Sequence, residues 1–136
     1  MFDHTADVGM RVEGRDLADL LETAAGGLFD AIAVDRSRIR PLEVEEVVLQ
    51  AESTLDLFAD WLSELIYRAE VGRKLYGKFE VEARPDERSL HAWIWGEPID
   101  LARHEFGSEV KAVTRHGLIV ERRADGSWFA ETILDI

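Results

Sequence analysis

The stretch TLDLFADWLSELIYRAEVG, at residues 54–72, is the feature that most limits the folds open to this chain. Its apolar residues recur at three- and four-residue spacing, which is typical of an amphipathic helix. The residues on the apolar face are Leu55, Phe58, Leu62, Leu65 and Ile66. Ser53 and Asp56 have the spacing of an N-terminal capping box, and Gly72 is a typical C-terminal cap. A helix of this kind must bury one face against another layer of its domain.

A second helical pattern covers residues 17–33. Asp16 is a good N-cap residue immediately before it. The run keeps its helical spacing in spite of the pair Gly26–Gly27, which lowers helix propensity. Its apolar face consists of Leu17, Leu20, Leu21, Ala24 and Leu28. The sequence therefore predicts two packed helices.

The remaining segments alternate apolar and polar residues, which is typical of half-buried strands. These segments are residues 8–14, 43–52, 78–84, 90–96, 110–122 and 128–136. The order β-α-β-α-β-β-β-β predicts an α+β fold, with two helices packed on a largely antiparallel sheet. No linker or internal repeat divides the 136 residues, so we expect a single domain over 1–136. Trp93 and Trp95 share one strand face, which we interpret as core rather than as a binding platform.

The charge balance disfavours direct nucleic-acid binding. Lys and Arg total 16 against 28 Asp and Glu, a net charge of -12, and the basic stretches at 35–40, 72–74 and 121–123 are short. We expect no tight contact with nucleic acid, and a cation or a basic protein as partner. With no membrane-length apolar run and no signal-peptide pattern, we expect a cytoplasmic protein with no membrane contact. The absence of cysteine excludes disulfides and thiolate chemistry.

Acidic residues also share one face of the helix at 54–72. Asp56, Asp60 and Glu64 are four residues apart and therefore lie on the same side. Such a stripe is usually the solvated side of an amphipathic helix. The alternative interpretation is a surface that attracts a cation or faces a partner.

Acidic residues gather at both ends of the chain as well. DHTAD occupies residues 3–7, and the last strand closes on TILDI at 132–136. Asp125–Gly126 favours a two-residue hairpin loop, which would place Asp135 opposite His116. A bulge at Gly117 would shift that pairing by one residue.

These acidic ends predict a metal site if the first strand lies beside the last. Asp3, Asp7, Asp135 and the α-carboxylate of Ile136 would then be close together and would need a counter-charge. Oxygen ligands of this kind suit Ca²⁺ or Mg²⁺. Zn²⁺ is disfavoured, because there is no cysteine and the histidines are scattered at 4, 91, 104 and 116. The alternative is that Asp3 or Asp7 caps backbone groups and that His4 is a core residue.

Five segments together resemble the archease family. They are DHTADVGMRVEG, LADLLETAAGGLFDAI, LFADWLSELIY, GSEVKAVTRHGLIVE and the closing ILDI, in family order over essentially the whole chain. Archeases are small acidic accessory proteins of RtcB-type RNA ligases, which join 2′,3′-cyclic phosphate or 3′-phosphate RNA ends to 5′-hydroxyls. The resemblance implies a non-enzymatic, metal-binding factor that promotes guanylylation and multiple turnover of the ligase in tRNA splicing and RNA repair.

The resemblance also implies roles for individual residues. The family's metal ligands correspond to Asp7, Asp135 and Ile136, with Ca²⁺ as the expected ion and Mg²⁺ or Mn²⁺ as alternatives. A functional lysine of the family corresponds to Lys111. Independently of the resemblance, the acidic N-terminus and the hairpin register suggest Asp3, His4 and His116 as residues near the metal. The hairpin register puts Lys111 beyond the end of the last strand, so it is not predicted to neighbour Asp135. Arg115 departs from the aromatic residue that many relatives carry before this histidine.

Two other functions compete with this interpretation. One is a stand-alone metal-dependent hydrolase that uses Asp3, His4, Asp7 and Asp135. Neither a nucleophile–base pair nor a glycine-rich phosphate loop accompanies these residues in the sequence, which disfavours hydrolysis. The other is a chaperone-like interaction protein that only presents a surface.

Overall fold

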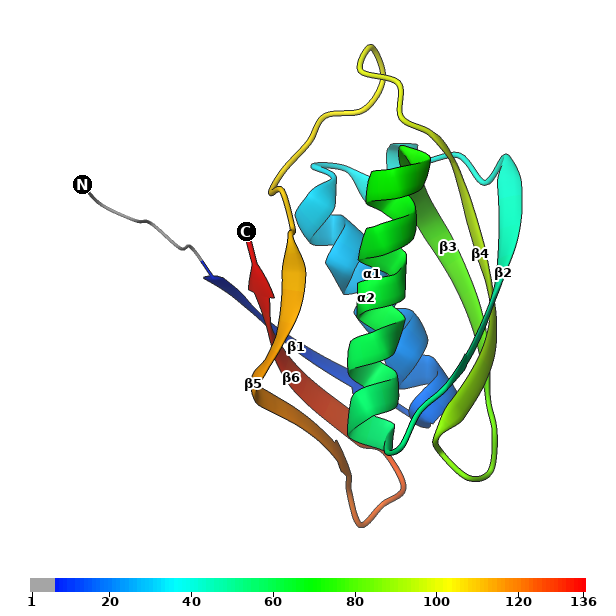
Figure 1. The fold of residues 1–136 in the computed structure, drawn as a ribbon, viewed down its shortest axis with the longest axis vertical. Coiled ribbons are helices and arrows are strands. Elements are labelled where there is room, and N and C mark those ends of the chain that lie inside the picture. The colour runs from blue at the N-terminus through cyan, green and yellow to red at the C-terminus, as the bar shows by residue number, and fades with distance from the viewer. Residues whose placement is uncertain (1–6) are drawn as a thin grey trace, which may run out of the picture.

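Two three-stranded sheets enclose two helices in the computed structural model, which describes residues 7–136 (Figure 1). The elements are β1 (Asp7–Gly14), α1 (Leu17–Ile32), the 3-10 helix η1 (Arg36–Arg38), β2 (Glu43–Gln50), α2 (Thr54–Gly72), β3 (Lys74–Ala83), β4 (Ser89–Pro98), β5 (Ala112–Arg122) and β6 (Trp128–Asp135). The predicted α+β class and element order are confirmed. The single predicted sheet is wrong, because the strands form two sheets of order β1-β6-β5 and β2-β4-β3, both antiparallel.

Local capping explains where both helices begin. The carboxylate of Asp16 accepts the backbone N–H of Asp19 at 2.8 Å, at the start of α1. The hydroxyl of Ser53 accepts the N–H of Asp56 at 3.1 Å, at the start of α2. These contacts satisfy donors that a helix leaves unpaired at its first turn. The predicted cap at Gly72 is wrong by one residue, since Arg73 takes the left-handed conformation, with φ 55°.

The core lies where the helices pack between the sheets. Both helices contact strands of both sheets, and the predicted apolar face of α1 is wholly buried. On α2, Leu55 is 36% exposed, and Trp61 is buried and donates its indole N–H to the carbonyl of Leu21 at 2.8 Å. A Cβ at Gly27 would lie 2.7 Å from the sulfur of Met10. A larger residue at this position would therefore require the Met10 side chain of β1 to move.

The outer face of the β2-β4-β3 sheet carries the two tryptophans of β4. Leu90, Ala92 and Ile94 point inward, which places Trp93 and Trp95 on the opposite face, where they are half-buried. The interpretation of this pair as core is therefore wrong. The ring of His91 stacks on Trp93 with centroids 4.2 Å apart, and the Lys78 ammonium lies 4.6 Å from the ring centroid of Trp95. None of the helices in the described range 7–136 is long and apolar enough to cross a membrane.

Candidate functional site

The first and last strands lie side by side, as predicted. In the antiparallel pair β1–β6, Asp7 lies directly opposite Asp135. The β-carbons of directly opposed residues are about 4.5–5.5 Å apart, and their side chains leave the sheet on the same face. On β6 that face alternates with the buried residues Ala130, Thr132 and Leu134. Asp3 and His4 lie outside the described residues.

The partner of Asp135 on its other side differs from the prediction. On β5 it is Ala112 rather than His116. The backbone N–H of Lys111 donates to the carbonyl oxygen of Asp135 at 2.7 Å. The expectation that Lys111 lies beyond the end of β6 is therefore wrong, because the backbone of Lys111 is hydrogen-bonded to Asp135, which lies opposite Asp7.

Two backbone irregularities account for the shifted register. The hairpin closes with the N–H of Arg123 on the carbonyl of Ser127 at 2.7 Å, so its loop has three residues and uses the left-handed Gly126, with φ 90°. Farther along β5, residues 115–118 oppose Thr132 alone, and Gly117 has φ 73°. Bulges of this kind add residues to one strand and redirect its side chains. The predicted one-residue shift was therefore too small.

The bulge brings Arg115 against α2. Its guanidinium forms ion pairs with Asp56 and, at 3.1 Å, with Asp60. Farther along the same acidic stripe, Arg68 pairs with Glu64 at 2.7 Å. The stripe of α2 therefore has cationic partners within the chain, which favours the solvated-face interpretation. Arg115, which stands where many relatives carry an aromatic residue, thus links β5 to α2 by ion pairs.

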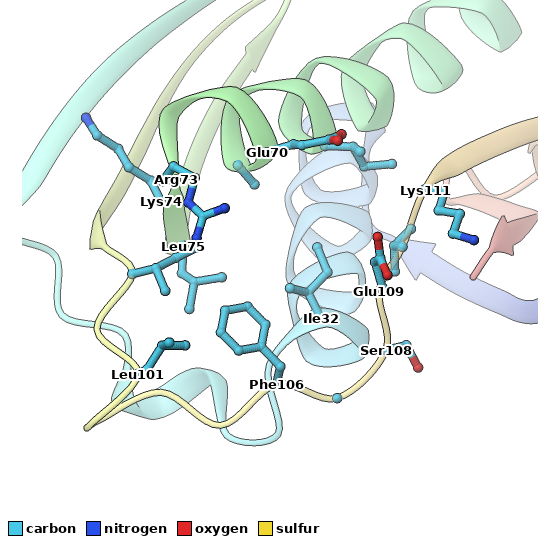
Figure 2. Close-up of a pocket in the computed structure, with 15 residues that line it drawn as sticks. Ile32, Glu70, Arg73, Lys74, Leu75, Leu101, Phe106, Ser108, Glu109 and Lys111 are labelled. Carbon is cyan, nitrogen blue, oxygen red and sulfur yellow. The ribbon is translucent and has the colours of Figure 1, made fainter.

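A pocket of about 560 Å³ adjoins the Lys111 segment (Figure 2). Its apolar lining includes Ile32, Ile66, Leu75, Phe106 and Val110. Figure 2 shows the guanidinium of Arg73 turned toward the cavity and the Lys111 side chain directed away from it, on the side of the terminal strands. The exposed Lys111 therefore lies between the paired aspartates and a pocket whose lining is part apolar and part charged.

A buried carboxylate anchors the segment that runs from β4 to Lys111. Glu97 is 1% exposed and accepts the backbone N–H of Arg40 at 2.7 Å. Arg103 donates to both carboxylate oxygens, at 2.9 and 3.0 Å. The carboxylate also accepts Nε2–H of the buried His104 at 2.9 Å, because Nδ1 of that ring already accepts the N–H of Asp100 at 2.9 Å.

These hydrogen bonds determine the charge state of Glu97. Burial alone would raise its pKa, but the backbone N–H of Arg40 and the side chains of His104, Arg103 and Arg40 outweigh burial and lower the pKa to about 2. Glu97 is thus ionised at neutral pH and fixes the start of the segment 99–111. No pattern in the sequence singled out Glu97, because its partners come from two separate stretches of chain, one at Arg40 and one at Arg103 and His104.

The model of the archease protein family matches residues 1–136. The chain belongs to the archease family. Protein archease of Methanopyrus kandleri is 40% identical over 136 residues, which cover 98% of this chain and 96% of that protein. Protein archease of Pyrococcus abyssi is 35% identical, with 99% of this chain and 96% of that protein covered. The residues predicted from the sequence as metal ligands, together with Lys111, therefore lie in an archease.

Solved structures have the same archease fold. The solution structure of Methanobacterium thermoautotrophicum protein 1598 matches with a TM-score of 0.74 and 32% identity, covering 99% of this chain and 96% of that one. The crystal structure of an archease from Thermotoga maritima, described as a possible chaperone, matches with a TM-score of 0.68 over 100% of this chain and 95% of that one. Its identity of 23% supports likeness of fold alone.

Among residues 7–136, no group of three or more His, Cys, Asp or Glu side chains is placed to hold a metal ion. The described part of the site thus offers two carboxylate side chains, those of Asp7 and Asp135. His116 is exposed on the bulge, where its backbone N–H donates to the hydroxyl of Thr114 at 3.1 Å. It is not the strand partner of Asp135.

Proposed function

We propose that this archease is a metal-binding accessory factor that activates an RtcB-type 3′-phosphate RNA ligase by promoting its guanylylation and multiple turnover. The observation that supports this function is the strand register, which brings Asp7, Asp135 and Lys111 together from both ends of the chain. Residues that the family resemblance links to metal binding and ligase activation thereby become neighbours.

The chemistry of the paired aspartates fits a hard divalent cation. Two carboxylates directly opposed on neighbouring strands repel each other, and a cation between them would reverse that interaction. Asp7 and Asp135 would hold the ion, and the α-carboxylate expected at Ile136 would be a third ligand. Ca²⁺ is the preferred candidate, with Mg²⁺ or Mn²⁺ as alternatives. Bound there, the ion would supply positive charge for an anionic group of the ligase or its nucleotide.

Lys111 would act beside this pair. Its backbone is held by Asp135, its side chain is exposed, and Figure 2 shows that side chain on the side of the terminal strands. A cation fixed at this position can bind a phosphate or carboxylate of the ligase complex. The apolar part of the adjacent pocket, around Ile32, Leu75 and Phe106, suits an apolar side chain of the same partner.

The net charge of -12 supports a transient encounter with a basic ligase surface. Complementary charge accelerates association more than it strengthens the final complex. It also opposes binding of RNA by the archease alone, since phosphate binding needs a basic face.

A ligation assay tests this function directly. The purified archease is added in substoichiometric amounts to a cognate RtcB-type ligase with GTP, divalent metal and RNA that carries 3′-phosphate and 5′-hydroxyl ends. We expect faster guanylylation and multiple turnover, with no reaction from the archease alone. RNA or phosphate hydrolysis by the archease alone would favour the hydrolase. An effect that needs stoichiometric protein and only prevents ligase aggregation would favour the chaperone.

A further inference from the structure

Strand β2 leaves one side of its backbone free at the edge of the β2-β4-β3 sheet (Figure 1). Among residues 7–136, β4 is its only strand partner, and no loop supplies a backbone hydrogen bond to residues 43–50. A free edge of this length can pair with an extended segment of another chain.

The side chains along this edge are also unusual for an outer face. A solvated sheet face is ordinarily polar. On β2, Val44 is 53% exposed and Val48 is 66% exposed, and Leu42 just before the strand is 62% exposed. Between the two valines stands Glu46, whose side chain is 65% exposed. Alternate residues on the exposed face of β2 are therefore apolar, acidic and apolar: Val44, Glu46 and Val48.

The other three sheet edges differ from β2. β5 is interrupted by its four-residue bulge. β3 has a register shift at Gly77, whose carbonyl accepts a hydrogen bond from Arg36 at 3.0 Å. β1 is regular, but its outward residues are Asp7, Gly9, Arg11 and Glu13. Within the described residues, β2 therefore combines a regular free edge with exposed apolar side chains.

We propose that β2 is a docking edge for an extended segment of a partner protein with the pattern apolar-x-Lys/Arg-x-apolar. Directly opposed residues in a sheet point to the same face. A strand added beside β2 would therefore set apolar residues against Val44 and Val48 and a cation against Glu46. This surface lies on the other sheet from Asp7 and Asp135, so the inference is independent of the proposed ligase activation.

Charge disfavours a second copy of the chain as the occupant. β2 contains no Lys or Arg, and of its three glutamates Glu43 and Glu45 pair with Lys74 of β3, whereas Glu46 lies exposed on the outer face. A two-fold antiparallel pairing with residue 44 opposite residue 48 sets Glu46 against its own copy, and like charges directly opposite destabilise a sheet. Two chains of net charge -12 also repel each other at longer range. A cationic segment removes both penalties.

The test uses a fluorescent seven-residue peptide, Thr-Val-Thr-Lys-Thr-Val-Thr, titrated with the full chain and followed by anisotropy. We expect saturable binding and slower hydrogen exchange of the amides of residues 43–50. The same peptide with Glu in place of Lys should bind at least about tenfold more weakly. A version N-methylated at alternate residues along the pairing edge should not bind, because it lacks the backbone donors.

Variants of the chain test whether the peptide binds at this strand edge or at other exposed apolar residues. Val44→Thr with Val48→Thr should weaken binding about tenfold, whereas Val71→Thr, at a valine 64% exposed on α2, should have no effect. Glu46→Lys should reverse the preference in favour of the Glu peptide. Absence of binding, binding insensitive to these changes, or dimerisation of the chain through Val44 and Val48 would overturn the proposal.

Discussion

Replacing Glu97 by glutamine should destabilise the fold by about 3 kcal/mol at neutral pH. The gap between its pKa of about 2 in the folded chain and the ordinary value of 4.5 corresponds to about that free energy. The side chain of Glu97 is 2% exposed, so little of this interaction is screened by solvent. Glutamine removes the charge and leaves the buried His104 with a weaker acceptor, while Arg40, at 53% side-chain exposure, can turn to water.

The lowered pKa of Glu97 also predicts how the destabilisation by Glu97→Gln changes with pH. Because the pKa of Glu97 is lowered on folding, its contribution is complete above about pH 5 and is lost as the pH falls toward 2. The unfolding free energies of wild type and Glu97→Gln should therefore differ by about 3 kcal/mol at pH 7 and converge near pH 2. At neutral pH the melting temperature should fall by roughly 10 °C.

Urea unfolding at a series of pH values measures both quantities. Glu46→Gln is the matched control, because Glu46 also contacts a histidine, His91, at 3.3 Å, but its side chain is 65% exposed. An exposed pair of this kind contributes little to stability. If Glu97→Gln is no more destabilising than Glu46→Gln, or if its effect is the same at pH 3 and pH 7, the assigned role of the buried carboxylate is wrong.

Three further predictions concern the paired chain ends. Lys111→Ala should leave the melting temperature unchanged and reduce ligase stimulation about tenfold or more, as expected for one lost charge-assisted hydrogen bond. The control Lys78→Ala should not reduce the stimulation. Equal stimulation by both variants would remove Lys111 from the site. Asp135→Asn should abolish calorimetric Ca²⁺ binding and ligase stimulation, and Glu131→Gln on the same strand face should preserve both; retained Ca²⁺ affinity in Asp135→Asn would contradict the assignment. Residues appended after Ile136 should impair Ca²⁺ binding more than an N-terminal tag does, and equal affinities would exclude the terminal carboxylate.

Local patterns in the sequence were sufficient to predict the elements of this fold. Apolar spacing and the cap residues Asp16 and Ser53 located both helices to within about one residue, because these signals act within one or two helical turns. The meeting of Asp7 and Asp135 was likewise expected from the acidic ends and is confirmed by the β1–β6 register.

Contacts between residues far apart in the sequence could not be predicted from such local patterns. The loop at Gly126 and the bulge at Gly117 moved the strand partner of Asp135 by four residues, from His116 to Ala112, which is why the position of Lys111 was mispredicted. A tight turn and a bulge both use glycine, and the number of extra residues depends on what packs nearby. Likewise, alternation showed that Trp93 and Trp95 share a face, but only the packed helices determine which face is buried.

A crystal structure of the archease grown with Ca²⁺ tests the central claim most directly. The account predicts one ion bound by carboxylate oxygens of both Asp7 and Asp135, at ligand distances of about 2.3–2.6 Å, with an oxygen from Ile136 in the same coordination sphere. Side chains of Asp7 and Asp135 more than about 8 Å apart cannot share one ion at such distances. That separation, or an ion bound elsewhere with this pair empty, would contradict the account.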